Sequence, residues 1–209
     1  MKTDSRYMFY DGGARELLQG PFSSQFQDIL DVIHGIIPEK TYECKSRDQR
    51  KNGRHYWNPT TLNLDFKREF CSRLGWESEP KYTFPLLPTQ ALWNLMKHLS
   101  PEEMRSFYQG HTGSTLEFKN LRGDYRHSNT GIGVEVQLGN GVYKTHDFSK
   151  FGSCVIFGFL QVGVIISPLQ SMHREMSDGT THYDRLKKDY TLWRMHSNPY
   201  PILLIGVEP

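Results

Sequence analysis

The chain alternates apolar and polar residues in the stretch Val134-Glu135-Val136-Gln137, which follows Asp124 after a short, turn-rich spacer. Successive side chains of a β-strand point to opposite faces, so Glu135 and Gln137 would share one face. The other face would carry Ile132, Val134, Val136 and Leu138. Carboxylates on two neighbouring segments suit Mg²⁺, which binds oxygen ligands and usually only one or two carboxylates. The pattern indicates metal-assisted hydrolysis of phosphodiester bonds.

The same alternation also occurs in half-buried edge strands that carry a glutamate into solvent. The interpretation of Glu135 therefore depends on the rest of the chain.

The composition is that of an ordinary soluble protein. The chain has 209 residues and a formal net charge of +2, and its mean hydropathy is −0.60. No apolar run approaches the roughly 20 residues of a membrane-spanning helix, and the N-terminus leads into no signal-peptide core. We expect a cytoplasmic protein that does not contact membranes and folds as a single domain over residues 1–209.

The three cysteines predict no chemistry. Cys44, Cys71 and Cys154 are odd in number and show no CxxC or Cys/His zinc spacing. The cysteines therefore predict neither a disulfide scaffold nor a zinc finger.

The first half of the chain has mainly helical spacing, and we expect a helical elaboration over about residues 20–110. Apolar residues from Phe26 to Ile37 predict a helix that Ser23 and Ser24 can cap. Asn58-Pro59 predicts an N-cap and first helical position, with the helix continuing towards Gly75. A proline-rich connector follows at residues 80–88, and two further helices are predicted at 92–99 and 100–110.

The second half changes to the period of strands and forms the predicted catalytic α/β core, at about residues 111–209. Strands are expected at 116–126, 133–138, 162–166 and 201–207. Helices are expected at 148–159, from Pro168 to Met176, and at 183–194. The run Val155-Ile156-Phe157 leaves a strand open as the alternative within the first of these segments. Alternating strands and helices predict a mixed central β-sheet flanked by helices.

Four stretches, in the same order, resemble the BglII/BstYI group of type II restriction endonucleases, and its BstYI branch most closely. They are residues 44–76, 132–139, 162–179 and 201–207. The resemblance implies a restriction-endonuclease-like PD-(D/E)xK fold and a homodimer. It also implies Mg²⁺-dependent cleavage of both strands of a palindromic site in double-stranded DNA, with a GATC centre in the group's known members.

The resemblance also implies a set of active-site residues. Asp124 and Glu135 would be the Mg²⁺ ligands, with Val136 as a further metal-binding position. Gln137 stands where most such nucleases carry a catalytic lysine. A neutral amide can orient water by hydrogen bonding but carries no charge.

Two other acids compete for a place in this site. The segment from Asp124 to Glu135 looks longer than in the resembled group, so Glu117 is a rival for the position of Asp124. Asp147 is a candidate outer-shell acid. For both Glu117 and Asp147 we favour a solvated carboxylate on a strand or at a helix cap.

A basic loop at residues 40–54 is the best candidate for contacts to DNA phosphates. It would otherwise be an ordinary solvated loop. Phosphate contacts are expected from Lys45, Arg47, Arg50 and Arg54, with hydrogen bonds to the DNA backbone or bases from Ser46 or Asn52.

Base recognition is expected from two loops. The resemblance places Asn140, just after the strand of Glu135, where its amide can pair with adenine. The second loop comprises Ser177, Asp178, Thr180 and His182. Asp178 can accept from cytosine, and Thr180 or His182 can contact a thymine methyl group or guanine N7. The alternative is a turn between helices in which Ser177 or Thr180 only caps. Asn140 and Asp178 differ from the BstYI pattern, which leaves the target sequence open.

The predicted function is that of a dimeric type II restriction endonuclease. Two alternatives remain open at this point. One is a sequence-specific DNA-binding protein that has lost cleavage, which the Gln137 substitution makes worth testing. The other is a metal-dependent repair nuclease with little sequence preference.

Overall fold

The computed structural model describes the chain except for residues 44–52, 86–117, 139–143, 177–179 and 196–198. The helices predicted at 92–99 and 100–110 lie outside the described residues. Within the described part of the chain, no helix is both long enough and apolar enough to cross a membrane.

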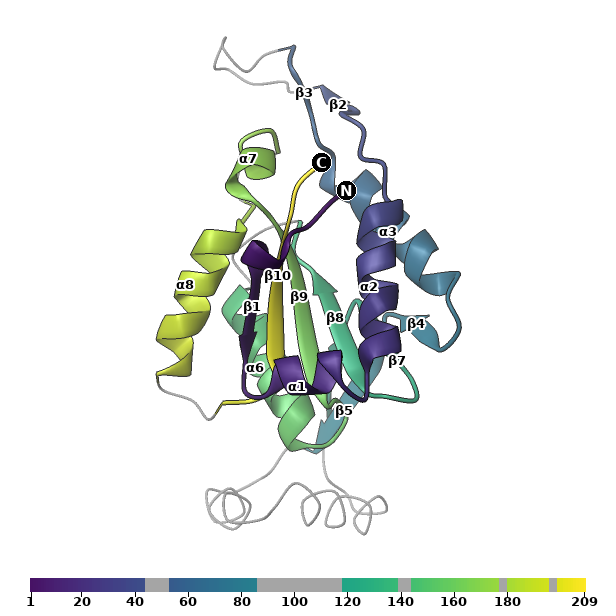
Figure 1. Cartoon of the computed structure of the whole chain (residues 1–209), viewed down its shortest axis with the longest axis vertical. Coiled ribbons are helices and arrows are strands. Elements are labelled where there is room, and N and C mark those ends of the chain that lie inside the picture. The colour runs from purple at the N-terminus through teal and green to yellow at the C-terminus, as the bar shows by residue number, and fades with distance from the viewer. Residues whose placement is uncertain (44–52, 86–117, 139–143, 177–179, 196–198) are drawn as a thin grey trace.

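A six-stranded mixed sheet forms the centre of the molecule (Figure 1). In spatial order its strands are β1 (Met8–Asp11), β10 (Ile202–Val207), β9 (Val162–Pro168), β8 (Ile132–Val136), β7 (Tyr125–His127) and β4 (Trp76–Ser78). The central strands β8, β9 and β10 are parallel, and the outer strands β1, β7 and β4 run antiparallel to their neighbours. The predicted mixed sheet is confirmed. Strands β1 and β4 nevertheless come from the first half of the chain, which was predicted to be largely helical.

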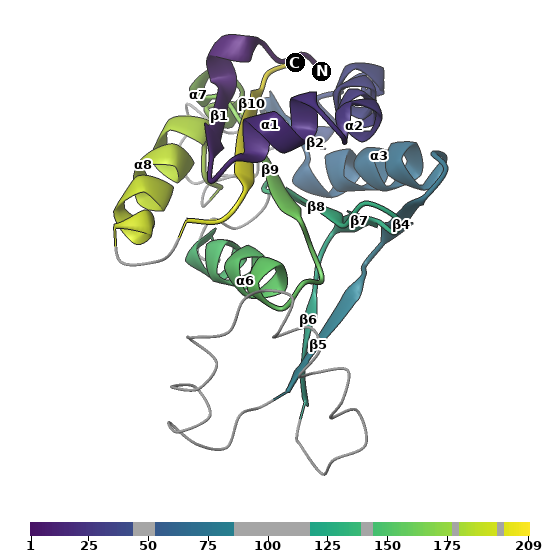
Figure 2. The same cartoon turned by 60° about the horizontal axis from the view of Figure 1, so that its bottom comes forward.

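Helices cover both faces of this sheet (Figure 2). One face packs against α1 (Ala14–Gln19), α2 (Ser23–Gly35) and α3 (Pro59–Cys71). The other face packs against α6 (Lys144–Ile156) and α8 (Tyr183–Arg194). The short elements are η1 (Ser5–Tyr7), before β1, and α7 (Gln170–His173), after β9.

Strand β8 has the predicted alternation. Its apolar residues Ile132, Val134 and Val136 belong to the core beneath α1, α2 and α3. On the opposite face, a Cβ at Gly133 would collide with Leu160 and Phe151, which lie on the α6 side. Glu135 therefore faces α6, and all five strand residues are buried. The alternative of a glutamate carried into solvent on an edge strand is wrong, because β8 is a central strand between β7 and β9.

The helices α2 and α3 show which local predictions hold. Asn58 caps α3, since its Oδ1 accepts the N–H of Thr60 at 2.9 Å. Helix α3 ends at Cys71, before the predicted end at Gly75, and Leu74 is 96% exposed. Helix α2 begins at Ser23, so Phe22 occupies the N-cap and makes no side-chain cap. The predicted capping by serine is therefore wrong.

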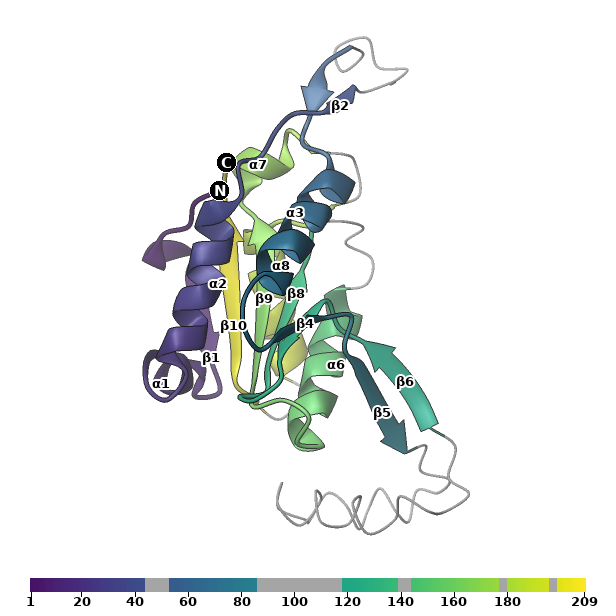
Figure 3. The same cartoon turned by 90° about the vertical axis from the view of Figure 1, so that its right-hand side faces the viewer.

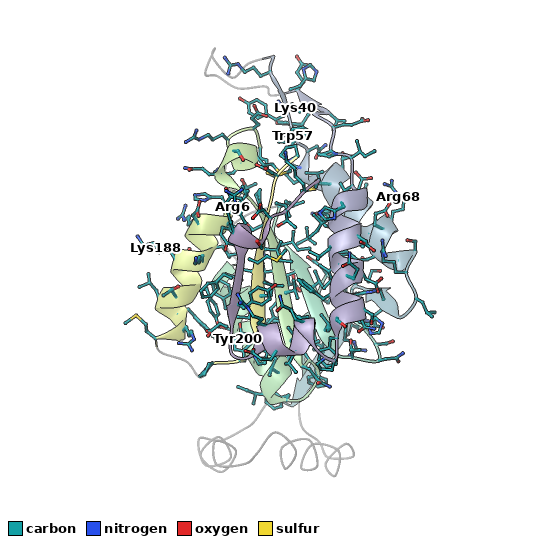
Figure 4. The ribbon with its side chains drawn as sticks, viewed as in Figure 1. Arg6, Lys40, Trp57, Arg68, Lys188 and Tyr200 are labelled. Atoms are coloured by element: carbon teal, nitrogen blue, oxygen red, sulfur yellow. The ribbon has the colours of Figure 1, made fainter. Side chains whose placement is uncertain are left out.

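Two hairpins project from opposite ends of the molecule (Figure 3). One consists of β2 (Tyr42–Glu43) and β3 (His55–Tyr56), and the other of β5 (Lys81–Pro85) and β6 (Phe118–Arg122). At the base of the first hairpin, the Lys40 Nζ lies 5.0 Å from the centre of the Trp57 ring and 2.6 Å from Glu175 Oε2 (Figure 4). These contacts tie the hairpin to the segment after α7.

The strand predicted over 116–126 is interrupted at Gly123 and Asp124. Strand β6 pairs with β5 before the break, whereas β7 pairs with β4 and β8 after it. The crossing consists of Gly123 and Asp124, where the chain passes from β6 to β7, and two backbone hydrogen bonds hold it. The Gly123 N–H donates to Pro80 O at 3.0 Å, and the Glu79 N–H donates to Asp124 O at 2.8 Å. Asp124 thus lies where the chain passes from the projecting hairpin into the central sheet.

Candidate active site

Asp124 and Glu135 are brought together by two hydrogen bonds between the crossing and β8. The Asp124 Oδ2 accepts the backbone N–H of Val136 at 2.8 Å. In return, the backbone N–H of Asp124 donates to Glu135 Oε1 at 3.1 Å. These bonds fix each carboxylate against the backbone of the other segment. The predicted pairing of these two acids in space therefore agrees with the structure.

Gly123 leaves room for this approach. A Cβ at this position would lie 3.2 Å from Glu135 Oε1 and 3.2 Å from the hydroxyl oxygen of Tyr82. Such contacts are tight enough to displace one of the two side chains. The absence of a side chain just before Asp124 is therefore part of what positions Glu135.

Lys150, on α6, reaches the same carboxylate and was not predicted. Its Nζ lies 2.7 Å from Glu135 Oε1 and 3.0 Å from Asp147 Oδ1. It also donates to the carbonyl oxygen of Arg122 at 3.1 Å. The side chain is only 4% exposed. The sequence did hold a signal, because Lys150 and Asp147 interrupt the helix face that buries Phe148, Phe151 and Cys154.

Gln137 and Asp147 complete a connected set of side chains. The Gln137 Nε2 donates to Asp147 Oδ2, while the backbone N–H of Gln137 donates to Ile166 O at 2.8 Å. Asp147 is buried, so the expectation of a solvated carboxylate is wrong for this residue. Asp147 lies in the first turn of α6, which brings it to Gln137 just after the end of β8.

Burial dominates the electrostatics of the site. Burial raises the pKa of Asp124 above its ordinary value, although the hydrogen bond from the Val136 N–H and the positive charge of Lys150 both act to lower that pKa. Burial and repulsion from Asp124 raise the pKa of Glu135 to about 8, and Lys150 opposes the shift. Burial alone would lower the pKa of Lys150, but attraction to Glu135 and Asp147 outweighs it and raises that pKa. A buried site rich in carboxylates is one that a further cation would stabilise.

The oxygen atoms present fit Mg²⁺. Among the described residues, no cluster of three or more histidine, cysteine, aspartate or glutamate side chains is placed to hold a metal ion. Mg²⁺ does not need one, since it is usually bound through one or two carboxylates together with water and substrate phosphate. The Val136 carbonyl accepts the N–H of Leu138 at 3.1 Å and keeps a second lone pair. Asp124, Glu135 and this carbonyl therefore offer the oxygen donors that Mg²⁺ prefers.

A surface pocket opens beside Asp124. Its volume is about 330 Å³. Lys67 and Glu79 form an ion pair of 2.8 Å at its wall. The remaining lining residues are Thr60, Asn63, Leu64, Ser78 and Tyr125. The pocket gives Asp124 a side that is open to solvent, whereas Glu135 is buried behind it.

Most of the predicted DNA-contacting residues lie outside the described residues, and so does the rival acid Glu117. The set comprises Lys45, Ser46, Arg47, Arg50, Asn52, Asn140, Ser177 and Asp178. Arg54 is exposed beside β3. Thr180 is buried, with its carbonyl oxygen 3.1 Å from His173 Nε2. His182 is half-buried at the N-cap of α8, and its Nδ1 lies 4.0 Å from Asp184 Oδ2.

A family model and a solved structure point to the same family of proteins. The family model described as restriction endonuclease BglII/BglIII matches residues 7–207. A crystal structure of restriction endonuclease BglII in complex with a DNA 16-mer superimposes with a TM-score of 0.64 at 15% sequence identity. The match covers 100% of this chain and 79% of that one. The likeness confirms the predicted restriction-endonuclease-like α/β fold. A search of curated protein sequences gave no match.

Proposed function

Because the chain belongs to the BglII/BglIII family of restriction endonucleases, which are hydrolases acting on DNA, we propose that it cuts both strands of a short palindromic site with Mg²⁺. The observation that carries this proposal is the pairing of Asp124 with Glu135 at the sheet crossing, beside an open pocket. The predicted roles of both acids as metal ligands, with the Val136 carbonyl, are retained.

Each residue of the site has a proposed task in hydrolysis. Asp124, Glu135 and the Val136 carbonyl would hold the metal. When bound at such a site, Mg²⁺ lowers the pKa of water and offsets negative charge on the phosphate. The Gln137 amide has a second N–H and a carbonyl oxygen besides the N–H that it gives to Asp147, and these would orient the attacking water. Asp147 would hold that amide in place.

The assembly proposed is a homodimer on double-stranded DNA. A dimer with two-fold symmetry has two identical active sites. A palindromic DNA site has two identical half-sites, so each subunit can bind one of them. The basic loop at residues 40–54 would contact phosphates. The loops of Asn140 and of residues 177–182 would contact bases, and the family resemblance supports a GATC-centred site.

Digestion of unmethylated phage DNA tests the proposal. We expect discrete fragments with Mg²⁺, no cleavage in EDTA, and no fragments from Glu135→Ala. Glu16→Gln, which changes an exposed carboxylate on α1, is the matched control and should cut normally. Sequencing the fragment ends would give the target and show whether its centre is GATC.

The same experiment separates the alternatives. Intact DNA with every divalent ion, combined with tight binding to one sequence, would favour the binding protein that has lost cleavage. A smear without preferred ends would favour the repair nuclease. Either result would contradict a restriction endonuclease.

A further inference from the structure

The candidate active site contains a buried cation that its predicted residues do not include. Among the described residues, Lys150 is the cation that the structure pairs with the carboxylates of this site. It comes from α6, whereas Glu135 and Gln137 come from β8 and the residue just after it. A nuclease site must stabilise negative charge that builds up on phosphate, and Gln137 is uncharged.

We propose that Lys150 is a catalytic residue whose ammonium group, delivered from α6, donates a hydrogen bond to the scissile phosphate. The proposal rests on the proposed DNA cleavage. In that reaction the water oxygen forms a bond to phosphorus, and the bond from phosphorus to the leaving sugar oxygen breaks. Water loses a proton to solvent and the leaving oxygen gains one from solvent. Lys150 stays protonated and only stabilises charge.

The position of the ammonium group supports this role. Its nearest partner is Glu135 Oε1 at 2.7 Å, the same oxygen that accepts the backbone N–H of Asp124. The lysine charge therefore lies against the paired acids, where the phosphate must bind if they hold the metal. A positive group at this point faces the charge that develops in the transition state.

The surroundings of Lys150 hold it in place. An ammonium group has three N–H donors, and without substrate the structure supplies Glu135, Asp147 and the Arg122 carbonyl as acceptors. The phosphate would take the place of the Arg122 carbonyl, which is the uncharged acceptor of the three. Helix α6 is itself anchored, because the Tyr200 hydroxyl donates to Phe148 O at 2.8 Å. A fixed donor needs little reorganisation when substrate binds, which is the property that makes electrostatic catalysis effective.

Asp147 links the two polar groups and would be a positioning residue. Its Oδ1 contacts Lys150, and its Oδ2 accepts the Gln137 amide. One carboxylate thus sets the place of both the ammonium group and the proposed water-orienting amide. A buried ion pair is poor evidence of a stabilising device, because desolvation can exceed the Coulombic gain. A role in function therefore explains the buried position of Lys150 better than a role in stability does.

Lys150→Met tests the proposal, since it removes the charge and keeps a side chain of similar length. Its control is Lys188→Met, which changes an exposed lysine on α8 (Figure 4). We expect single-turnover cleavage with Mg²⁺ to fall about 100-fold or more in Lys150→Met and to be unchanged in Lys188→Met. DNA binding measured with Ca²⁺ should stay within about threefold of wild type, because Lys150 acts mainly on the charge that develops in the transition state.

A second readout does not depend on cleavage. Without DNA, Ca²⁺ should bind Lys150→Met more tightly than the wild type by calorimetry, because a competing positive charge has left Glu135. A lysine with a purely structural role would instead leave Ca²⁺ binding unchanged or weaker.

Relocating the charge covers the case in which Lys150→Met fails to fold. The double variant Gln137→Lys with Lys150→Gln should cut at least about tenfold faster than Lys150→Gln alone, because the ammonium group returns from the strand. Equal rates for these two variants, or wild-type cleavage by folded Lys150→Met, would overturn the proposal while leaving the nuclease function intact. An inactive wild type would instead remove the proposed function.

Discussion

At the scale of single residues, the ionised form of Glu135 is unfavourable in its surroundings, and a bound metal ion would stabilise it. Its carboxylate is buried beside Asp124, and these surroundings raise its pKa to about 8. The protonated form therefore persists well above the usual range for glutamate. A divalent ion binds the deprotonated form, so protons compete with the metal below that pKa.

The expected consequence is a metal affinity that rises with pH. Calorimetry of Ca²⁺ binding should show tighter binding from about pH 6 to about pH 8 and a plateau above it, because a proton no longer competes there. Glu135→Gln should bind weakly and lose this dependence. An affinity that is the same across this range would show that Glu135 is already ionised, contrary to the account.

Gly123 offers a second test at this scale. Gly123→Ala places a methyl group about 3.2 Å from Glu135 Oε1 and from the Tyr82 hydroxyl, so one of them must move. We expect about a tenfold loss of cleavage rate, since small displacements of catalytic groups are costly. Circular dichroism should show an intact fold. A fully active Gly123→Ala would mean that the position of Glu135 is less constrained than the contacts imply.

At the scale of elements, α6 and β8 together build the site. The first two turns of α6 supply Asp147 and Lys150, and β8 with the residue after it supplies Glu135 and Gln137. The contact between them is a buried ionic network whose members depend on one another. Breaking such a network from one side leaves charges without partners.

Lys150→Met should therefore also destabilise the metal-free protein. Removal of one partner of a buried ion pair costs about 3 kcal/mol or more, and urea unfolding in EDTA should show a loss of that order. Added Mg²⁺ should restore part of it, because the ion supplies the missing positive charge. Lys188→Met should have no measurable effect. Equal stability of Lys150→Met and wild type in EDTA would contradict the buried network.

The elements also show what could be predicted from the sequence. Helix α8 was predicted at its observed bounds, and α2, β9 and β10 were predicted close to theirs, because each carries a clear apolar period. Strands β1 and β4 were missed. They have four and three residues, too few for a period to show, and they are strands because they pair with β10 and β7. The prolines at residues 80 and 85 predict a connector where the structure has strand β5.

The features of the candidate site also differ in how far the sequence predicts them. The alternation within one strand places Glu135 and Gln137 on the same face. The pairing of Asp124 with Glu135 follows from their neighbouring segments, and the family resemblance implies it as well. Lys150 and Asp147 could be noticed as polar residues that interrupt the apolar face of α6, but their contacts with Glu135 and Gln137 depend on how α6 packs on the sheet. The break at Gly123 and Asp124 was missed for the same reason, since it depends on β5 as the partner of β6.

At the scale of the whole molecule, the central sheet carries the candidate site and the two hairpins extend away from it at opposite ends (Figures 1 and 3). Arg54 lies on the hairpin of β2 and β3 and is exposed. Its proposed contact to a DNA phosphate can be tested without knowing the bases that are recognised. Phosphate contacts contribute to affinity through counterion release and carry no direct sequence information.

Arg54→Ala should weaken DNA binding by a similar factor on every sequence. The slope of log affinity against log salt concentration should become shallower by about one unit, as expected for one lost phosphate contact. The cleavage site should not change. A relaxed target sequence with an unaltered salt slope would instead assign Arg54 to base recognition.

The central claim is that Asp124 and Glu135 form a metal-dependent site for DNA cleavage, and one assay tests it most directly. Wild type, Asp124→Asn and Glu135→Ala would be compared on a duplex that carries the identified target, with binding measured in Ca²⁺ and cleavage in Mg²⁺. The account predicts that all three bind the duplex and that only the wild type cuts it, in both strands. Cleavage by either variant at the wild-type rate, or by the wild type in EDTA, would contradict it.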